Sequence, residues 1–187
     1  GLSLLLFAPV YLLFLLIPFC SRRFQRFPRN ETVRSLKLEN STKNTRDSDS
    51  ESSHEVSVCI CTFNRPKGLS RLLRSLSAQK FKHNSSVYFE VVVVDNHPSQ
   101  KGIPFARNTA VESSSPDTSY IAFLDDDETV DEYWLDELLK IQDSREAQVV
   151  VGPVIRRFET PPPQWVREGG FFDDPDLEDG EMTRFGR

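Results

Sequence analysis

From residue 56 onward the chain alternates between two patterns of hydrophobic and polar positions. Short apolar runs rich in β-branched residues, each closed by polar residues, are typical of buried strands and cover 56–62, 87–94, 120–124 and 148–155. Apolar residues at helical spacing predict one helix that starts at Pro66 and two more over 105–113 and 131–142. Alternating strands and helices predict an α/β domain with a mainly parallel sheet flanked by helices.

The first residues follow a different pattern. Residues 2–20 are 19 positions without a charge, and a membrane-spanning helix needs about 20 apolar residues. We therefore expect one hydrophobic N-terminal helix, a membrane anchor over residues 1–21. Two alternatives are the core of a signal peptide, although its cleavage site would be a poor one, and a translated upstream stretch that is not part of the working protein.

The charges after this apolar run predict its orientation. Six basic residues follow it, against the single acid Glu31: Arg22, Arg23, Arg26, Arg29, Arg34 and Lys37. Because positive residues stay on the cytoplasmic side of a membrane, we expect the remaining domain on that side. Glycosylation sequons at Asn30, Asn40 and Asn84 would matter only in a lumen, and such short patterns arise by chance in a Ser-rich stretch.

Residues 22–55 are basic at first and then polar, with few apolar side chains toward their end. Such a segment buries too little surface to offset its ordering entropy, which predicts a flexible linker with His54 as a solvated residue. The chain therefore divides into a hydrophobic segment at 1–21, a linker at 22–55 and a domain at 56–187.

Composition excludes several classes of protein. The 187 residues carry a net charge of −5, which argues against a nucleic-acid partner, and three cysteines are too few for a disulfide scaffold. Cys59 and Cys61 lie two apart on a predicted strand and so share one face, which favours a reduced core pair over a metal site. A phosphate-binding P-loop is excluded because its GxxxxGK[ST] pattern does not occur.

Polar residues follow three of the predicted strands. They are Thr62 to Arg65, then Asp95 and Asn96, and finally Asp125 to Glu128. In parallel sheets, ligands bind beyond the carboxyl ends of the strands, so these groups are expected to meet at one edge. The adjacent carboxylates Asp125, Asp126 and Asp127 favour a divalent cation, Mg²⁺ or Mn²⁺. The alternative is a solvated loop before a helix.

Four segments together resemble the family 2 glycosyltransferases. VSVCICTFNRP, EVVVVDN, KGIPFARNTAVE and YIAFLDDDETVDEYWLDEL occur in this order, and the resemblance covers residues 56 to about 167. GPV followed by PPPQWV is similar to a bacterial branch of the family. The resemblance implies the GT-A fold, which is Rossmann-like, and an inverting transfer of a sugar from a nucleotide-diphosphate donor to an acceptor hydroxyl. It favours a UDP-sugar as donor and a saccharide or a lipid-linked acceptor.

The resemblance also implies roles for particular residues. Thr62, Asn64 and Arg65 would line the nucleoside pocket, and Asp95 would bind the base or the ribose. Arg107 would lie near the base or the pyrophosphate.

The aspartate triplet would complete the donor site. By the same resemblance, Asp125 and Asp126 would lie on the ribose and sugar side. Asp127, the last residue of the DXD triplet, would be the main ligand of Mn²⁺ or Mg²⁺, with Asp125 as the second metal ligand. Simpler interpretations are that Asn64 and Arg65 only shape a turn, and that Arg107 pairs with Glu112.

Two features depart from the family pattern. Only residues 96–106 separate Asp95 from Arg107, where relatives place a helix and a further strand. We assign no role to His97 in this short turn. The family's catalytic base is an acidic residue well downstream of the triplet, and the acids between 173 and 181 lie in a stretch with loop composition. We therefore expect the base beyond Arg187 and an incomplete acceptor half.

Two alternatives for the function stay open. Asp125 to Val130 after an apolar strand also fits the DxDx(T/V) pattern of haloacid-dehalogenase-like phosphatases, in which the first Asp is a nucleophile. That interpretation leaves Thr62, Arg65, Asp95 and Arg107 unexplained. The other alternative is a nucleotide-sugar-binding fragment without catalysis, which agrees with both departures.

Overall fold

The computed structural model describes residues 16–18, 33–38, 54–84, 86–95, 102–155, 157–158 and 160–170. For 16–18 and 33–38 it describes only the backbone. The chain forms two compact units, one over Phe14–Gly152 and one that combines Gly1–Leu13 with Pro153–Arg187. The predicted functional residues all lie in the first unit.

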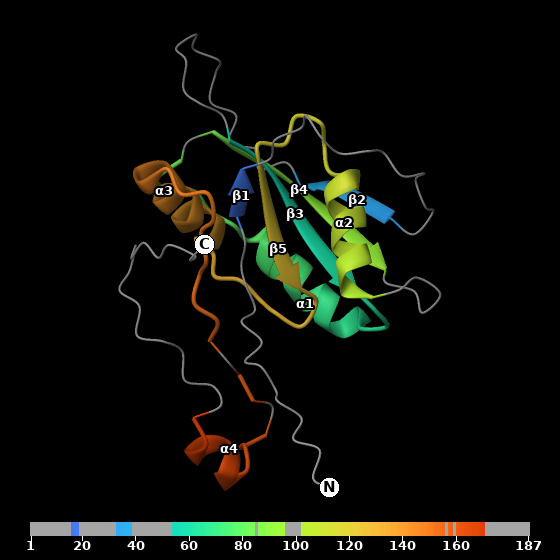
Figure 1. Ribbon diagram of the computed structural model, residues 1–187, viewed down its shortest axis with the longest axis vertical. Coiled ribbons are helices and arrows are strands. Elements are labelled where there is room, and N and C mark those ends of the chain that lie inside the picture. Colours follow the sequence, from blue (N-terminus) through green and yellow to red (C-terminus); the bar gives the residue numbers. More distant parts are fainter. Residues whose placement is uncertain are drawn as a thin grey trace, which may run out of the picture. The chain divides into compact units, whose positions relative to one another are not determined.

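A five-stranded sheet in the order β1-β5-β3-β4-β2 is the centre of that unit (Figure 1). Its three inner strands are parallel: β3 (His54–Thr62), β4 (Val87–Asp95) and β5 (Tyr120–Asp125). The edge strands β1 (Leu16–Pro18) and β2 (Val33–Leu38) pair antiparallel with β5 and β4. The expected α/β fold with a mainly parallel sheet is confirmed, and it is consistent with the GT-A architecture.

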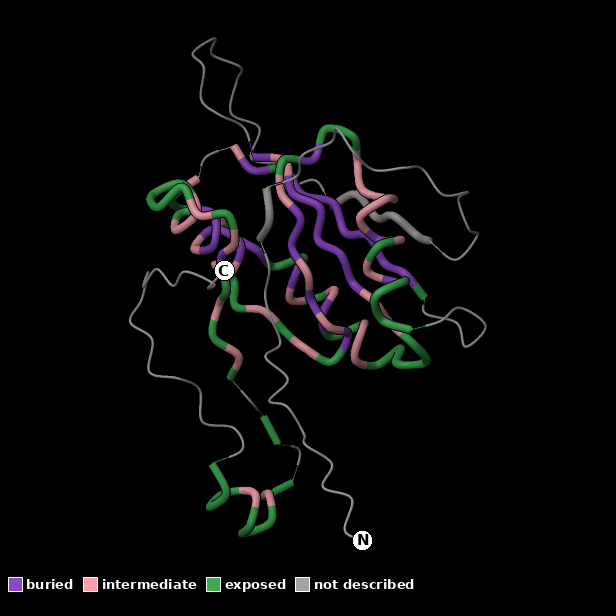
Figure 2. Tube along the Cα trace, viewed as in Figure 1, coloured by how far each residue is buried: buried purple, intermediate pink, exposed green. Residues whose placement is uncertain are grey.

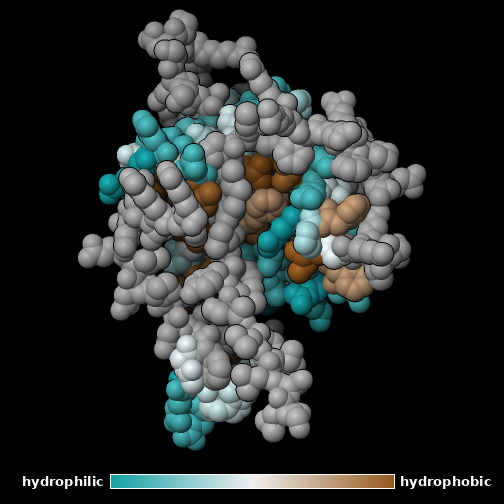
Figure 3. Space-filling view, in the orientation of Figure 1, coloured by the Kyte–Doolittle hydropathy of each residue, from teal (hydrophilic) through white to brown (hydrophobic). Residues whose placement is uncertain are grey.

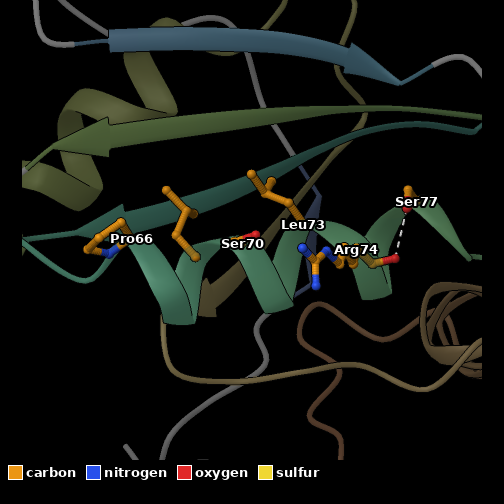
Figure 4. Close-up of a pocket in the computed structure, with 6 residues that line it drawn as sticks. Pro66, Ser70, Leu73, Arg74 and Ser77 are labelled. Atoms are coloured by element: carbon orange, nitrogen blue, oxygen red, sulfur yellow. Dashed lines mark hydrogen bonds between the residues drawn. The ribbon is translucent and has the colours of Figure 1, made fainter.

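The helices follow the strands as predicted. α1 (Pro66–Ser77) connects β3 to β4, and α2 (Ile103–Ser113) connects β4 to β5. α1 and α2 lie on opposite faces of the sheet (Figures 1 and 4). This is the arrangement that crossovers of one hand require, since the chain moves from β3 to one neighbour and then back past β3 to the other. α3 (Trp134–Arg145) follows β5.

The core lies on both faces of the sheet, and most residues of the central strands β3 and β4 are buried (Figure 2). Val58, Cys59 and Ile60 are completely buried, as expected for a central parallel strand. On the α2 face, Ala106 and Ala110 of the helix pack in one cluster with Cys59, Val92, Val94 and Ile121. Small alanines allow α2 to approach closely, which fixes the position of its N-terminal half beside the carboxyl ends of the strands.

Two of the predicted elements differ from the structure in ways that the sequence explains. Within the expected strand 148–155, Val150 forms only an isolated bridge, and residues 151–155 have no regular structure. Gly152 and Pro153 explain this, because proline cannot donate to a strand ladder and glycine weakens one. The third helix begins at Trp134 instead of Asp131, since Asp131 to Tyr133 form a turn.

The N-terminal residues also differ from expectation where the structure describes them. Leu16–Pro18 form β1 and not part of a helix, and Val33–Leu38 form β2 and not part of a flexible linker. His54 is not solvated, because it begins β3 and its Nε2 lies 3.1 Å from Asp143 Oδ2. Each of these pairings depends on a distant segment that local composition does not reveal. Most of 1–21 and 22–55 lies outside the described residues.

Among the described residues, no helix is both long and apolar enough to cross a bilayer. The described part of the second unit includes a short helix, α4 (Gln164–Glu168), preceded by Pro163.

Candidate functional site

The carboxyl end of β3 supplies the first half of the site. After Thr62 the chain turns through Asn64, whose φ of 51° lies in the left-handed region that asparagine tolerates better than most residues. Arg65 precedes Pro66, which starts α1 at a position where its missing N–H does no harm. Thr62 and Arg65 are therefore held between a buried strand and a helix start.

The carboxyl end of β5 supplies the second half, and Asp126 connects the two. Its side chain is only 8% exposed. The Thr62 hydroxyl donates a hydrogen bond of 2.7 Å to Asp126 Oδ2, and Arg65 Nη1 donates one of 3.2 Å to Oδ1. A buried carboxylate needs such partners, because an unpaired buried charge is strongly unfavourable. The predicted strand-end groups thus meet at one edge of the sheet.

Arg65 reaches both Asp126 and Asp127. Its Nη1 atom also lies 2.7 Å from Asp127 Oδ2, so one nitrogen bridges the two carboxylates. Asp126, followed by Asp127, raises the pKa of Arg65 above its ordinary value, so the guanidinium stays charged. Asp127 remains 57% exposed and Arg65 58% exposed, which leaves both accessible from solution.

Asp125 forms a second pair, with Arg107 of α2. Arg107 Nη2 lies 3.5 Å from Asp125 Oδ1, and the guanidinium lies 5.6 Å from the centre of the Phe123 ring. Burial raises the pKa of Asp125 above its ordinary value, although the charge of Arg107 opposes this. The simpler interpretation that Arg107 pairs with Glu112 has no support in this geometry.

Asp95 and Asn64 lie beside this network. Asp95 is the exposed last residue of β4 and the register partner of Thr62. Asn64 is exposed in the turn between Thr62 and Arg65. The fold therefore brings all eight predicted site residues to one edge. Thr62 and Arg65 contact side chains of the aspartate triplet, and Arg107 contacts Asp125.

Two residues to which the sequence analysis gave no role of their own also shape the site. A Cβ atom on Gly68, in the first turn of α1, would collide with the main-chain carbonyl oxygen of Asp126. A glycine inside a helix, where it is unfavourable, was a signal that something approaches closely.

Glu128 is the second such residue. Its Oε2 accepts a 3.0 Å hydrogen bond from the Asp125 N–H, and its own N–H donates to the Asp125 carbonyl oxygen. Among the described residues, its buried Oε1 has no hydrogen-bond partner. Burial raises the pKa of Glu128 to about 7. Glu128 thus closes the turn that carries the triplet, a role that an acid directly after three aspartates could have suggested.

The carboxylates of the aspartate triplet suit a divalent cation. In the described ranges, no group of three or more His, Cys, Asp or Glu side chains is arranged as a metal site. Mg²⁺, however, is usually bound through one or two carboxylates and completes its shell with substrate phosphates and water. The guanidinium of Arg65 already lies between Asp126 and Asp127, so this position accepts a cation. The residues present therefore fit a metal that shares its shell with a substrate.

Cys59 and Cys61 agree with the expected reduced core pair. Both are free, Cys59 is buried and Cys61 is partly exposed at the register position next to Asp125. Burial raises the pKa of Cys59 to about 12 and that of Cys61 to about 11, so neither thiol is reactive at neutral pH.

An open groove runs along α1, away from the triplet. Figure 4 shows its lining residues, which are Pro66, Leu69, Ser70, Leu73, Arg74 and Ser77. It offers one charged group and no carboxylate, so it does not have the chemistry of the predicted donor site. Around the site itself, the large apolar side chains of Phe63, Ile103 and Phe105 are about half exposed. Figure 3 shows hydrophobic patches beside hydrophilic ones on the face that carries α2.

Comparison with known proteins agrees with this geometry. The chain matches the sequence model of the glycosyl transferase family 2 over residues 96–184, which include α2, the aspartate triplet and α3. It is also 32% identical over 140 residues to the succinoglycan biosynthesis protein ExoM of Rhizobium meliloti (strain 1021). Both matches support a family 2 glycosyltransferase. They disfavour the phosphatase interpretation of the aspartate triplet.

The match to ExoM covers 62% of this chain and 44% of that relative. The chain thus spans less than half the length of the curated relative. Several predictions, including those for His97, the short connection after Asp95 and the acids at 173–181, fall wholly or partly outside the described residues.

Proposed function

We propose that this chain binds a nucleotide-diphosphate sugar at the carboxyl edge of its sheet and acts in metal-dependent sugar transfer with inversion. One observation supports this most strongly. The β3–α1 turn and the aspartate triplet, more than 60 residues apart in sequence, form one hydrogen-bonded network through Thr62, Arg65 and Asp126. Similarity to the glycosyl transferase family 2 supports the reaction class, and the expected donor is a UDP-sugar.

In this proposal each strand end recognises one part of the donor. Thr62, Asn64 and Asp95 contact the nucleoside. We place Arg65 at the pyrophosphate, together with Arg107, and not in the nucleoside pocket as first expected, because a guanidinium binds phosphate oxygens through strong charge-assisted hydrogen bonds. Asp125 and Asp126 lie on the ribose and sugar side.

Asp127, with Asp125 as a second ligand, would hold Mn²⁺ or Mg²⁺. Such an ion neutralises the two phosphates of the donor and stabilises the charge that develops on the leaving group. The side chain of Asp127 suits this role because it is the most exposed of the triplet, at 57% against 32% for Asp125 and 8% for Asp126. We assign the catalytic base to none of the described residues.

The acceptor is proposed as a saccharide or a lipid-linked saccharide. The name of the relative, a succinoglycan biosynthesis protein, supports a role in building a polysaccharide. Half-exposed Phe63 and Phe105 beside the site would suit an acceptor with apolar surface.

Calorimetry with UDP, with and without MnCl₂, tests the proposal. We expect Mn²⁺ to strengthen UDP binding in the parent, and Asp127→Ala to abolish the metal-dependent part while metal-free affinity stays nearly unchanged. Asp117→Ala removes an exposed carboxylate from the loop before β5 and serves as the matched control. Equal metal dependence in the parent and in Asp127→Ala would refute the assignment.

We also propose that residues 1–21 attach the protein to a membrane, with the domain on the cytoplasmic side. The uncharged run and the six basic residues after it support this. In addition, Asn84 Nδ2 donates to both Asp136 Oδ1 and the Asp136 carbonyl oxygen, so this sequon asparagine is engaged within the fold. The pairing of Leu16–Pro18 with β5 competes with the anchor, since paired residues do not lie in a spanning helix at the same time.

Membrane vesicles decide between these arrangements. A reporter cysteine at Ser50, in a Cys20→Ser background, should be labelled only from the cytoplasmic side, and alkaline extraction should leave the protein in the membrane. Labelling from the opposite side would reverse the orientation. Release by alkali would favour the strand over the anchor.

A further inference from the structure

We propose that Arg65 is an exchangeable internal cation, which pairs with the expected metal ligand Asp127 in the free protein and moves to the donor pyrophosphate when a metal binds there. This inference rests on the proposed function and adds to it a residue that determines how metal and nucleotide depend on each other. It concerns the protein before any ligand is present.

The contacts of Arg65 carry the first step of the argument. A single nitrogen, Nη1, lies 2.7 Å from Asp127 Oδ2 and 3.2 Å from Asp126 Oδ1. Asp127 is the main metal ligand of the proposed function, so a divalent cation held there would need the carboxylate that this nitrogen contacts. Two cations beside one carboxylate repel each other, so the metal would compete with the guanidinium for Asp127.

The surroundings of Arg65 allow this displacement. The side chain is 58% exposed and lies just before α1, so it can rotate into solvent without opening the core. Asp126 does not lose its support in the exchange, because the Thr62 hydroxyl still donates to Oδ2. Asp127 Oδ2 then becomes available to the cation.

The released guanidinium carries the second step. Released from Asp127, Arg65 would remain next to the aspartate triplet, where its guanidinium would bind the pyrophosphate of the donor. A guanidinium binds phosphate oxygens best through two parallel hydrogen bonds from two of its nitrogens. In the free protein Arg65 contacts both carboxylates through the single nitrogen Nη1, so it does not use this geometry. Arg107 is less suited to this exchange, because it pairs at a longer 3.5 Å with Asp125 and not with the main metal ligand Asp127.

The exchange makes two predictions of opposite sign for Arg65→Ala. Without nucleotide, Mn²⁺ should bind more tightly, about threefold to tenfold, because an exposed ion pair of this kind no longer competes. With saturating Mn²⁺, UDP should bind about tenfold or more weakly, because a charge-assisted contact to phosphate is lost. A residue that only stabilised the fold would weaken both.

The experiment uses the full chain and Mn²⁺ alone as the first probe, with free Mn²⁺ followed by electron paramagnetic resonance. UDP titrations by calorimetry form the second arm. Arg71→Ala, an exposed arginine on α1, controls for the loss of one positive charge. Arg65→Lys keeps the charge and should retain most of the competition with Mn²⁺ while losing part of the UDP affinity. Circular dichroism checks that each variant is folded.

Each outcome decides the inference. Tighter Mn²⁺ and weaker UDP in Arg65→Ala, with neither change in Arg71→Ala, would support it. Unchanged Mn²⁺ affinity, a loss of both affinities, or a gain in both would overturn it. If the parent shows no metal-dependent UDP binding, the proposed function fails, and the Mn²⁺ arm alone still tests whether Arg65 competes for the cation position.

Discussion

Gly68 in the first turn of α1 lies against the main-chain carbonyl oxygen of Asp126, so close that a Cβ atom would collide with it. Asp126 is also held by Thr62 and Arg65 from the preceding turn. The start of α1 therefore sets the position of the aspartate triplet through one close backbone contact and two side-chain bonds.

Gly68→Ala should destabilise the protein, although alanine normally favours a helix. At an open helix position the exchange would stabilise by about 0.5–1 kcal/mol. Here the added methyl group meets backbone, and such overpacking costs about 1–3 kcal/mol. We expect a lower free energy of unfolding in urea and weaker binding of UDP with Mn²⁺. Ser70→Ala, on an exposed position of α1, is the control. A Gly68→Ala variant more stable than the parent would show that the triplet can move away without loss.

Thr62→Val tests the hydroxyl that supports Asp126. Valine has nearly the same shape but donates no hydrogen bond, so the buried carboxylate keeps only the bond from Arg65. Loss of a partner to a buried polar group costs about 1–3 kcal/mol, and more when the group is charged. We expect a destabilised protein in urea titrations, with Thr62→Ser restoring most of the loss. If valine and serine behaved alike, the hydroxyl would have no part in holding Asp126.

The inner strands and the helices were predictable because their patterns are local. The run at 56–62 and the leucines after Pro66 carry the periods of a strand and a helix within a few residues, and the structure confirms them as β3 and α1. The meeting of Thr62, Asp95 and Asp125 at one edge followed from the rule for parallel sheets.

Other features depend on contacts between distant segments. The pairing of Val33–Leu38 with β4 uses free backbone groups at a sheet edge, and no local pattern announces it. The bridge from Arg65 to Asp127 joins residues 62 positions apart, and the sequence indicates only that both lie at the same edge. The roles of Gly68 and Glu128 were not predicted, because they depend on the close approach of Gly68 to the Asp126 carbonyl and on the turn that Glu128 closes with Asp125.

The two core cysteines should differ in reactivity. Burial raises the pKa of Cys59 to about 12 and that of Cys61 to about 11, and only Cys61 is partly exposed. In a Cys20→Ser variant, a disulfide reagent at pH 8 should label Cys61 slowly and Cys59 only after unfolding in urea. The thiolate is the reactive form, so labelling of Cys61 should accelerate about tenfold per pH unit between pH 7 and 9. Rapid labelling of both residues in the folded protein would contradict the burial described above.

Asp136 provides a test of stability far from the triplet. This residue in the first turn of α3 is completely buried. Its two carboxylate oxygens accept hydrogen bonds of 3.0–3.2 Å from the backbone N–H groups of Lys82, His83 and Asn84, and one of 2.9 Å from Asn84 Nδ2. Burial alone would raise the pKa of Asp136, but these bonds outweigh it and hold the pKa below the ordinary 3.8.

The sign of the pH dependence follows from that lowered pKa. A carboxylate with a lower pKa in the folded state stabilises the fold above its unfolded pKa, and this stabilisation is lost as the pH falls through the folded value. Asp136→Asn keeps one oxygen as acceptor and places an amide donor against backbone donors, so we expect a loss of about 2–4 kcal/mol at pH 7. Urea unfolding at pH 7, 4.5 and 3 should show the difference between parent and variant shrinking at the lowest pH. Asp117→Asn, at an exposed position, should leave the parent's pH profile unchanged. An Asp136→Asn variant as stable as the parent at pH 7 would show that the turn at 82–84 does not depend on this carboxylate.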